Sequence, residues 1–181
     1  MKKQGIELRP IKQTDLQKLW EIGFKENDAS WKRWDGPYFQ KNTFTKAIFM
    51  AEKELEWVDN PNRFIIMCDD EIIGTISAYW VDPELQKWLE FGLCIYTDKY
   101  WGRGVGAIAC SMWLDYLFES HSELRRIGFT TWSGNKRMIK LGERLGMTCE
   151  ATVRQVRFFE GEWYDSIKYG VLATEWQESR N

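Results

Sequence analysis

The residues best suited to chemistry lie in one glycine-rich stretch, Trp101-Gly102-Arg103-Gly104-Val105-Gly106. Glycine has no Cβ, so a cluster of glycines allows a tight turn in which several backbone N–H groups point at one spot. The apolar run 91–96 precedes the stretch. Apolar residues at helical spacing follow it, at Val105, Ile108, Ala109, Met112, Trp113, Tyr116 and Leu117. Because the first amides of a helix bind anions, the sequence predicts a phosphate-binding loop between a strand and a helix.

Two common nucleotide-binding motifs do not fit this loop. A Walker-type loop requires Gly-Lys followed by Ser or Thr, and the stretch contains no such sequence. A dinucleotide-binding fingerprint requires a wider spacing before its third glycine than Gly102, Gly104 and Gly106 provide. Both kinds of nucleotide site are therefore excluded.

The stretch instead resembles the acyl-CoA pyrophosphate loop of the GNAT acetyltransferases, Gln/Arg-x-x-Gly-x-Gly/Ala, in the form Trp101-x-x-Gly104-x-Gly106. Tryptophan in the first position is similar to the ribosomal-protein N-acetyltransferase branch, where Trp-Gly-Lys/Arg-Gly is common. About 30 residues later, the segment from Asn135 to Met147 resembles the family helix Asn-x-x-Ser-x-x-x-x-Glu-Lys-Leu-Gly-Phe. The resemblance extends from Ile6 to about Trp176.

The resemblance implies that acetyl-CoA is the acetyl donor and that CoA is the product. The backbone of Ile95 and Tyr96 would bond the pantetheine arm in a gap between two splayed parallel strands, and a nearby amide would donate to the oxyanion. The pyrophosphate would lie against the loop residues Trp101, Gly102, Arg103, Gly104, Val105 and Gly106.

The second motif contributes the other residues that the resemblance assigns to the donor. Asn135 would contact the pantetheine arm next to the catalytic centre, and Met138 belongs to the same helix. Lys140 and Arg144 form, with Lys136 and Arg137, a basic cluster that would reach the 3′-phosphate of CoA; the alternative is a solvated helix face.

Glu90 is the candidate for assisting deprotonation of the acceptor amine. The pKa of a lysine amine is about 10.4 and that of an α-amino group about 8, so an α-amino group needs little help. Glu90 lies among apolar neighbours, which would raise the pKa of its carboxyl, or it acts through an ordered water. Relatives of this branch carry Glu-x-Gly-Tyr here, which corresponds to Glu90-Phe91-Gly92-Leu93. The alternative is an edge-strand carboxylate that faces solvent.

A general acid is harder to identify. Many GNAT enzymes have a tyrosine next to the CoA sulfur, seven residues after the asparagine, where this chain has Gly142. A thiol with a pKa of about 8.5 can leave as the thiolate, so a strong acid is not essential.

The acceptor site is predicted in the segment that contains Trp31, Trp34, Asp35 and Tyr38. Aromatic faces and a carboxylate suit an ammonium group or a cationic peptide end. The alternative is that these aromatic residues cap the core between the first two helices. Tyr164, on the last predicted strand, is a further candidate with the same alternative.

Composition limits the remaining possibilities. A chain of 181 residues predicts a single domain, 1–181, and a formal charge of −2 favours neither nucleic acid nor membrane as a partner. No apolar run approaches the roughly 18 residues of a membrane helix. His121 is the only histidine, which argues against histidine triads and zinc sites. Reduced, buried thiols in a cytoplasmic protein are predicted at Cys68, Cys94, Cys110 and Cys149.

The hydrophobic pattern predicts an α/β protein with a mixed sheet, in agreement with the GNAT fold that the resemblance implies. The expected sheet has about seven mostly antiparallel strands and one splayed parallel pair, with about four helices. A capping box at Thr14 to Gln17 would begin the first helix. A second helix would be capped by Asn42. Its predicted buried stripe is Phe44, Ala47, Ile48, Ala51 and Leu55. The predicted strands are 6–11, 64–68, 72–81, 89–96, 126–132, 153–159 and 163–172.

The sequence thus predicts a cytoplasmic N-acetyltransferase that moves an acetyl group from acetyl-CoA directly to a primary amine. A protein N-terminus is the first expectation for the acceptor, and a polyamine or an aminoglycoside is the alternative. A CoA-sensing domain without catalysis is the rival from another class, and a tryptophan-rich carbohydrate- or RNA-binding domain is a weaker one. The expected assembly is a monomer or a homodimer without a metal.

Overall fold

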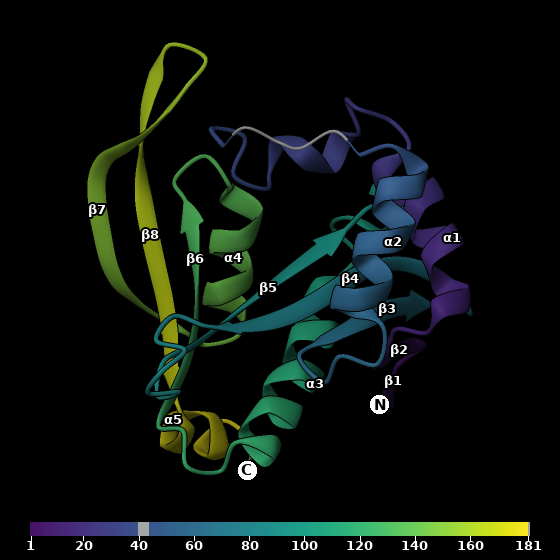
Figure 1. The fold of residues 1–181 in the computed structure, drawn as a ribbon. Coiled ribbons are helices and arrows are strands. Elements are labelled where there is room, and N and C mark those ends of the chain that lie inside the picture. Colours follow the sequence, from purple (N-terminus) through teal and green to yellow (C-terminus); the bar gives the residue numbers. More distant parts are fainter. Residues whose placement is uncertain (40–43, 181) are drawn as a thin grey trace.

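The computed structural model describes residues 1–39 and 44–180. Within these residues the strands form one eight-stranded sheet in the order β1-β2-β3-β4-β5-β6-β8-β7 (Figure 1). The strands are β1 (Lys2–Lys3), β2 (Ile6–Pro10), β3 (Arg63–Cys68), β4 (Glu71–Trp80), β5 (Leu89–Ile95), β6 (Arg126–Trp132), β7 (Thr148–Phe159) and β8 (Glu162–Leu172).

Among the described strands, β5 and β6 form the parallel pair, and the other neighbouring strands are antiparallel. The parallel contact is short, because it comprises Leu89 opposite Ile127 and Glu90 opposite Gly128. Beyond Glu90 the two strands diverge, with β5 remaining on β4 and β6 remaining on β8 (Figure 1). The sheet is therefore divided by a V-shaped gap whose apex lies at Glu90.

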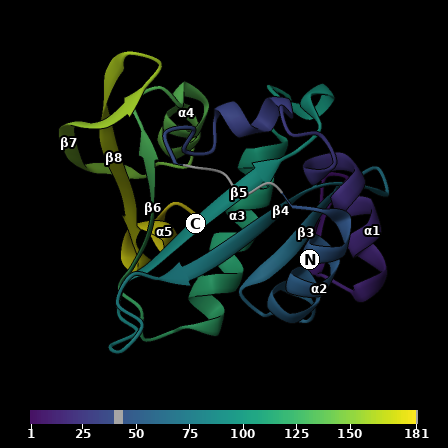
Figure 2. The ribbon, with the colours of Figure 1, turned by 45° about the horizontal axis from the view of Figure 1, so that its top comes forward.

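Helices cover both faces of the sheet (Figures 1 and 2). They are α1 (Leu16–Leu19), α2 (Lys46–Trp57), α3 (Val105–Ser120), α4 (Lys136–Arg144) and α5 (Ala173–Glu178). One apolar core, centred on Trp113 and Phe129, is shared by α3, α4 and the sheet. The other core, around Phe49 and Tyr96, joins α1 and α2 to the opposite face. Among the described residues, no helix combines the length and apolar character that a membrane crossing requires.

The predicted fold class is confirmed, and most differences concern element boundaries. An eighth strand arises because Lys2–Lys3 pairs with the start of β2, and α5 forms after the last predicted strand. β7 begins at Thr148, several residues before its predicted start at Val153. The first residues of the strand were missed because this exposed edge strand carries no alternating apolar pattern.

The predicted capping box at Thr14 is wrong, because the helical segment is entered through a 3₁₀ turn, Gln13–Asp15. The carboxylate of Asp15 accepts a hydrogen bond from the Lys12 amide at 2.8 Å and pairs with Arg9 at 2.7 Å. Burial raises the pKa of Asp15, but these two partners outweigh burial and the pKa is lowered. The apolar residues that follow, Leu16, Leu19, Trp20 and Phe24, pack in the core.

The predicted buried face of α2 is also wrong. The helix begins after Thr45, whose Oγ1 accepts a hydrogen bond from the Ile48 amide at 3.3 Å; Asn42 lies outside the described residues. Ile48 and Leu55 are exposed, and the buried face carries Phe49, Lys53 and Trp57. Burial of the large aromatic rings of Phe49 and Trp57 removes much apolar surface from water, so these two rings determine the rotation of the helix.

Candidate active site

A cavity of about 1060 Å³ occupies the gap between β5 and β6 and extends beneath the segment 31–39. It collects residues from the glycine-rich stretch, α4, both strands and the aromatic segment. The predicted residues on its wall are Trp31, Trp34, Asp35, Tyr38, Ile95, Trp101, Gly102, Gly104, Val105, Gly106, Asn135, Met138, Lys140 and Arg144. The wall does not include Glu90, Tyr96, Arg103 or Tyr164.

The glycine loop has the geometry of an anion site. Gly102 and Gly104 adopt φ angles of 73° and 80°, a left-handed conformation that residues with a Cβ rarely adopt. Gly104 caps α3, and its carbonyl accepts hydrogen bonds from Ala107 and Ile108 at 3.0 and 3.2 Å. The earlier amides of the helix have no intrahelical acceptor and carry the positive end of the helix dipole. They are therefore suited to bind a pyrophosphate.

Positive side chains stand beside this loop. The two terminal guanidinium nitrogens of Arg144 lie 3.6 Å from the place that a Cβ on Gly104 would occupy. Lys140 lines the same wall, whereas Arg103 is exposed and does not line it. The end of α4 and the start of α3 thus combine charge and free amides at one place, which fits a phosphate group.

The backbone of β5 offers hydrogen-bonding groups to the gap, but at partly different positions from those predicted. The Tyr96 amide already donates to Ile73 on β4 at 2.9 Å. Because antiparallel pairs alternate, Cys94 and Gly92 also direct their backbone groups to β4, while Ile95 and Leu93 direct theirs into the gap. The Ile95 carbonyl already accepts a hydrogen bond from Trp101 Nε1 at 2.9 Å, so its amide is the group that remains available. Leu93 is therefore a candidate that the sequence analysis missed, although the period-two pattern of a strand contained it.

Asn135 connects the cavity wall to the aromatic segment. Its Oδ1 accepts a hydrogen bond from the Met138 amide at 3.0 Å and so caps α4. Its Nδ2 donates to the carbonyl oxygen of Trp34 at 3.0 Å, and Trp132 Nε1 donates to the same oxygen at 3.1 Å. The aromatic segment is thereby fixed to the ends of β6 and α4.

Arg137 strengthens this connection. Its guanidinium lies 4.5 Å from the ring centroid of Trp34 and 4.2 Å from that of Trp101. The stack joins the glycine loop, α4 and the aromatic segment in one column of cation–π contacts. Arg137 was predicted to belong to the basic cluster that reaches the 3′-phosphate of CoA or faces solvent; the structure instead places its guanidinium against these two rings.

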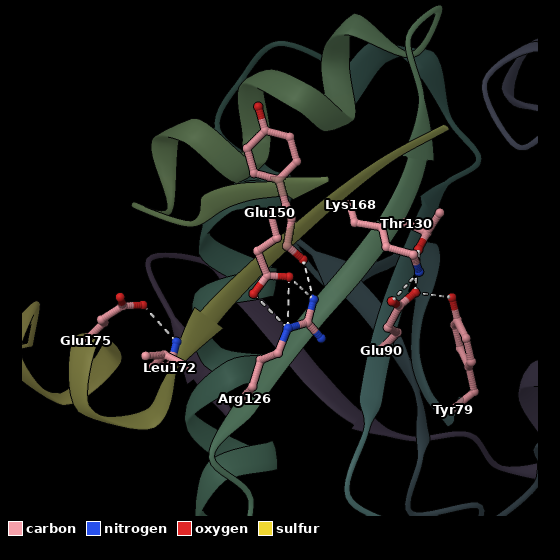
Figure 3. A network of polar contacts seen from close by, with 9 residues as sticks. Tyr79, Glu90, Arg126, Thr130, Glu150, Lys168, Leu172 and Glu175 are labelled. Atoms are coloured by element: carbon pink, nitrogen blue, oxygen red, sulfur yellow. Dashed lines mark hydrogen bonds and ion pairs between the residues drawn. The ribbon is translucent and has the colours of Figure 1, made fainter. Parts of the chain in front are cut away.

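Glu90 is the centre of a buried polar network (Figure 3). Only 2% of its surface is exposed, so the alternative of a solvent-facing carboxylate is wrong. Thr130 Oγ1 donates to Glu90 Oε2 at 2.7 Å, the Tyr79 hydroxyl donates to the same oxygen at 3.2 Å, and Lys168 Nζ lies 3.1 Å from Oε1. Lys168 Nζ also donates to Thr130 Oγ1 at 2.9 Å.

The raised pKa that we expected for Glu90 is wrong as well. Burial does raise the pKa of the carboxyl, but the hydrogen bonds from Thr130 and Lys168 and the positive charge of Lys168 outweigh burial, so the pKa is lowered. Glu90 is therefore an ionised carboxylate at neutral pH. Tyr79 and Thr130 line the cavity although Glu90 does not, so their hydroxyls separate the carboxylate from the cavity.

The aromatic segment divides between core and wall. Trp31 is 8% exposed, donates from Nε1 to the Gly23 carbonyl at 2.7 Å and packs edge-on against Tyr96. Trp31 is thus a core residue that also reaches the cavity. Trp34 and Tyr38 are half-buried on the wall, and Asp35 is exposed there. Tyr164 lies behind the wall, packed edge-on against Trp132 with ring centroids 4.8 Å apart.

Gly142 faces the core and leaves no room for a side chain. A Cβ at this position would lie 2.8 Å from Phe129 Cζ and 2.9 Å from Tyr169 Cδ1. These two rings stack with centroids 5.3 Å apart beneath the helix. The glycine is therefore explained by the close packing of α4 on the sheet.

The comparisons with known proteins agree with this geometry. The GNAT acetyltransferase domain matches residues 6–148. The "Putative ribosomal N-acetyltransferase YdaF" of Bacillus subtilis (strain 168) is 28% identical over 180 residues, with 96% of this chain and 94% of that protein covered. The ribosomal-protein-serine acetyltransferase of Escherichia coli (strain K12) is 23% identical over 165 residues, covering 91% and 90%.

Solved structures show the same fold. The spermidine N-acetyltransferase from Vibrio cholerae, in complex with CoA and spermine, superimposes with a TM-score of 0.77 at 18% identity, over 97% of this chain and 99% of that one. A GNAT-family acetyltransferase from Bacillus anthracis gives a TM-score of 0.75 at 20% identity, over 97% and 99%. The domain match extends over most of the sequence and includes the glycine loop, β5, β6 and α4. The chain therefore belongs to the GNAT family and is an acetyl-CoA-dependent N-acetyltransferase.

Proposed function

We propose that the acceptor is the N-terminal α-amino group of a polypeptide. The observation that carries this proposal is the balance of charge on the cavity wall. Among the described wall residues, Asp35 is the single carboxylate, whereas Lys32, Arg137, Lys140, Arg144 and Arg157 are cationic. A polyamine brings several ammonium groups and requires several carboxylates. A polypeptide N-terminus brings a single ammonium group, which is followed by a neutral backbone.

We propose a role for each group on the cavity wall. Acetyl-CoA supplies the acetyl group as an activated thioester. The amides of the glycine loop, with Arg144, hold its pyrophosphate. Leu93 and Ile95 offer the backbone groups that align the pantetheine arm, and an amide of β5 donates to the oxyanion. A thiol pKa of about 8.5 allows departure as the thiolate, so glycine at 142 is compatible with turnover.

Glu90 completes this arrangement as a fixed negative charge near the amine. We propose that the ammonium proton of the acceptor passes to the Glu90 carboxylate through the hydroxyl of Thr130 or Tyr79. Thr130 suits this task because it donates to Glu90 and accepts from Lys168, which fixes the direction of its proton. An α-amino group with a pKa of about 8 is already partly neutral at pH 7, so a weakly basic carboxylate is sufficient. All four cysteines are free; Cys68 and Cys110 are buried as predicted, whereas Cys94 is only partly buried and Cys149 is exposed. We propose that the protein is located in the reducing cytoplasm.

An amine panel tests the proposed acceptor. Acetyl-CoA turnover is measured with a peptide that has a free N-terminus, with the same peptide blocked at its N-terminus but carrying one lysine, and with spermidine. We expect kcat/KM to be highest for the free N-terminus, because its amine has the lowest pKa and a single positive charge. Faster turnover of spermidine would reject the proposal. CoA binding without turnover of any of the three would indicate a sensor domain.

Two substitutions test the acceptor end of the cavity. Asp35→Asn is expected to raise the KM for the acceptor more than it lowers kcat, because the carboxylate contributes binding in ground and transition states alike. Trp34→Ala is expected to raise the same KM by roughly tenfold, since its aromatic face contributes about 1–2 kcal/mol to a bound cation. Steady-state kinetics and thermal melts of both variants provide the measurement.

A tryptophan outside the cavity serves as the control. Trp163 is 59% exposed and does not line the wall, so Trp163→Ala should leave the acceptor KM unchanged. If Trp34 only supports the core, its removal costs roughly 3–5 kcal/mol of stability while the acceptor KM stays constant. That combination would remove Trp34 from the acceptor site.

A further inference from the structure

Arg157 is brought to the cavity by an irregularity in β7. The register between β7 and β8 shifts between Val153 and Arg157. Within this bulge Gln155 has a φ of 52°, and its amide donates to Asp165 Oδ1 at 2.9 Å. Such bulges redirect the strand that carries them. Beyond the bulge, pairing resumes with Arg157 opposite Tyr164, and Arg157 lies on the cavity wall.

The side chain of Arg157 packs on the aromatic segment, residues 31–39. Its guanidinium lies 5.0 Å from the ring centroid of Tyr38 and 5.4 Å from that of Phe39. Its Nε is buried and has no hydrogen-bond partner among the described residues. Within 1–39 and 44–180, no carboxylate lies close enough to Arg157 to form an ion pair. The guanidinium of Arg157 thus reaches the cavity without an ion pair to a carboxylate of that part of the chain.

The position of Arg157 separates it from the groups suited to CoA. Gly104 of the glycine loop lies beside Arg144 at the end of α4, and Asn135 lies at the beginning of the same helix. Nine residues of helix span about 13 Å. The wall then continues from Asn135 to Trp34 and Tyr38, and Arg157 packs beyond them. Arg157 therefore faces the acceptor and not the pyrophosphate.

We infer that Arg157 binds a carboxylate carried by the acceptor, so that the preferred acceptor is an amine with an acidic group near it. This inference rests on the proposed function and adds its sequence preference: a peptide N-terminus followed closely by aspartate or glutamate. Guanidinium groups bind carboxylates through two parallel hydrogen bonds, and stacking on Tyr38 and Phe39 holds the planar group in place. Asp35 on the same wall would accept the ammonium end of the same molecule.

Charge reversal tests the inference directly. Turnover is compared between two peptides that differ only in a glutamate or a lysine at the second position. For the unmodified protein we expect kcat/KM to favour the glutamate peptide by roughly 10- to 100-fold, as is typical of a hydrogen-bonded charge. Arg157→Glu should reverse the preference, and Arg157→Gln should abolish it without reversal, mainly through KM.

Arg154 offers a matched control on the same strand. It is exposed and lines a separate hollow with Gln155 and Asp165, so Arg154→Glu should keep the preference for the glutamate peptide. Thermal melts of all variants confirm folding. If the ratio of kcat/KM for the glutamate peptide to kcat/KM for the lysine peptide is unchanged in Arg157→Gln, the inference is overturned. The proposed acetylation of α-amino groups would be unaffected by that result.

A second pair of acceptors tells whether the bound carboxylate belongs to a peptide side chain or to a free amino acid. Tyrosine and tyramine differ only in an α-carboxylate, so a preference for tyrosine that is lost in Arg157→Gln would assign the site to free amino acids. Acetylation of the small amines alone, without a carboxylate preference, would overturn both the inference and the proposed peptide acceptor.

Discussion

Gly104→Asp is expected to weaken CoA binding by at least roughly 100-fold while the fold persists. The new carboxylate would stand where we propose that the pyrophosphate binds, and it would neutralise Arg144, whose nitrogens lie 3.6 Å from the Cβ position. The φ angle of 80° adds backbone strain of about 1–3 kcal/mol for a residue with a Cβ. Calorimetric titration with CoA measures the affinity, and circular dichroism measures the fold.

The chain contains a matched control for this substitution. Gly161, in the turn between β7 and β8, has a φ of 84° and no atom within 4 Å of its Cβ position. Gly161→Asp thus introduces the same charge and a similar strain outside the cavity, and its affinity for CoA should equal that of the unmodified protein. If Gly104→Asp also keeps full affinity, the glycine loop does not bind the pyrophosphate.

Glu90→Gln is expected to lower kcat by roughly 100-fold and to leave the KM for acetyl-CoA unchanged, because it removes the proton acceptor but keeps the shape. The pKa of Glu90 is lowered, so its ionisation is complete well below neutral pH. The acid limb of the rate profile should therefore follow the pKa of the acceptor amine. The defect should shrink as the pH rises past about 8, where the amine is already neutral.

The same substitution has a predictable effect on stability. A carboxyl whose pKa is lowered by folding stabilises the protein above its ordinary pKa of about 4.3, and this contribution is lost as the pH falls through the folded value. The difference in stability between Glu90→Gln and the unmodified protein should therefore be largest near neutral pH and narrow in acid. Lys168 is partly exposed, so water can solvate the amine that loses its partner.

Glu150 offers a matched control for the kinetic effect. It forms the carboxylate half of an ion pair with Arg126, close to the Glu90 network but off the cavity wall (Figure 3). Glu150→Gln should keep kcat. Unaltered turnover of Glu90→Gln at pH 7 would assign Glu90 to structure instead of catalysis.

The local motifs were predictable because they depend on few neighbours. The glycine loop requires a positive φ and a following helix, and both requirements are visible in Gly102, Gly104 and the apolar spacing of α3. Asn135 was identified through its resemblance to the family motif, and the structure adds that its side chain caps α4. The alternation of β5 likewise placed Glu90 on a defined face of the sheet.

Features that depend on distant partners were not predictable in this way. The pKa of Glu90 is set by Thr130 on β6 and Lys168 on β8, which are far away in the sequence. The buried face of α2 follows from aromatic residues of other elements that pack on Phe49. Arg157 reaches the aromatic segment through a bulge whose position carries no hydrophobic signal.

We expect the two-residue contact between β5 and β6 to link the abundance of this protein to its donor. In the described part of the chain, no neighbouring strand covers the inner edges of β5 and β6 beyond this contact. A ligand present at 100 times its dissociation constant stabilises the folded state by about 2.7 kcal/mol, which reduces the unfolded fraction by about a hundredfold. Because proteases degrade unfolded chains, molecules in a cell short of acetyl-CoA and CoA would be removed faster. The supply of the metabolite would then set how much of the enzyme survives as well as how fast it works.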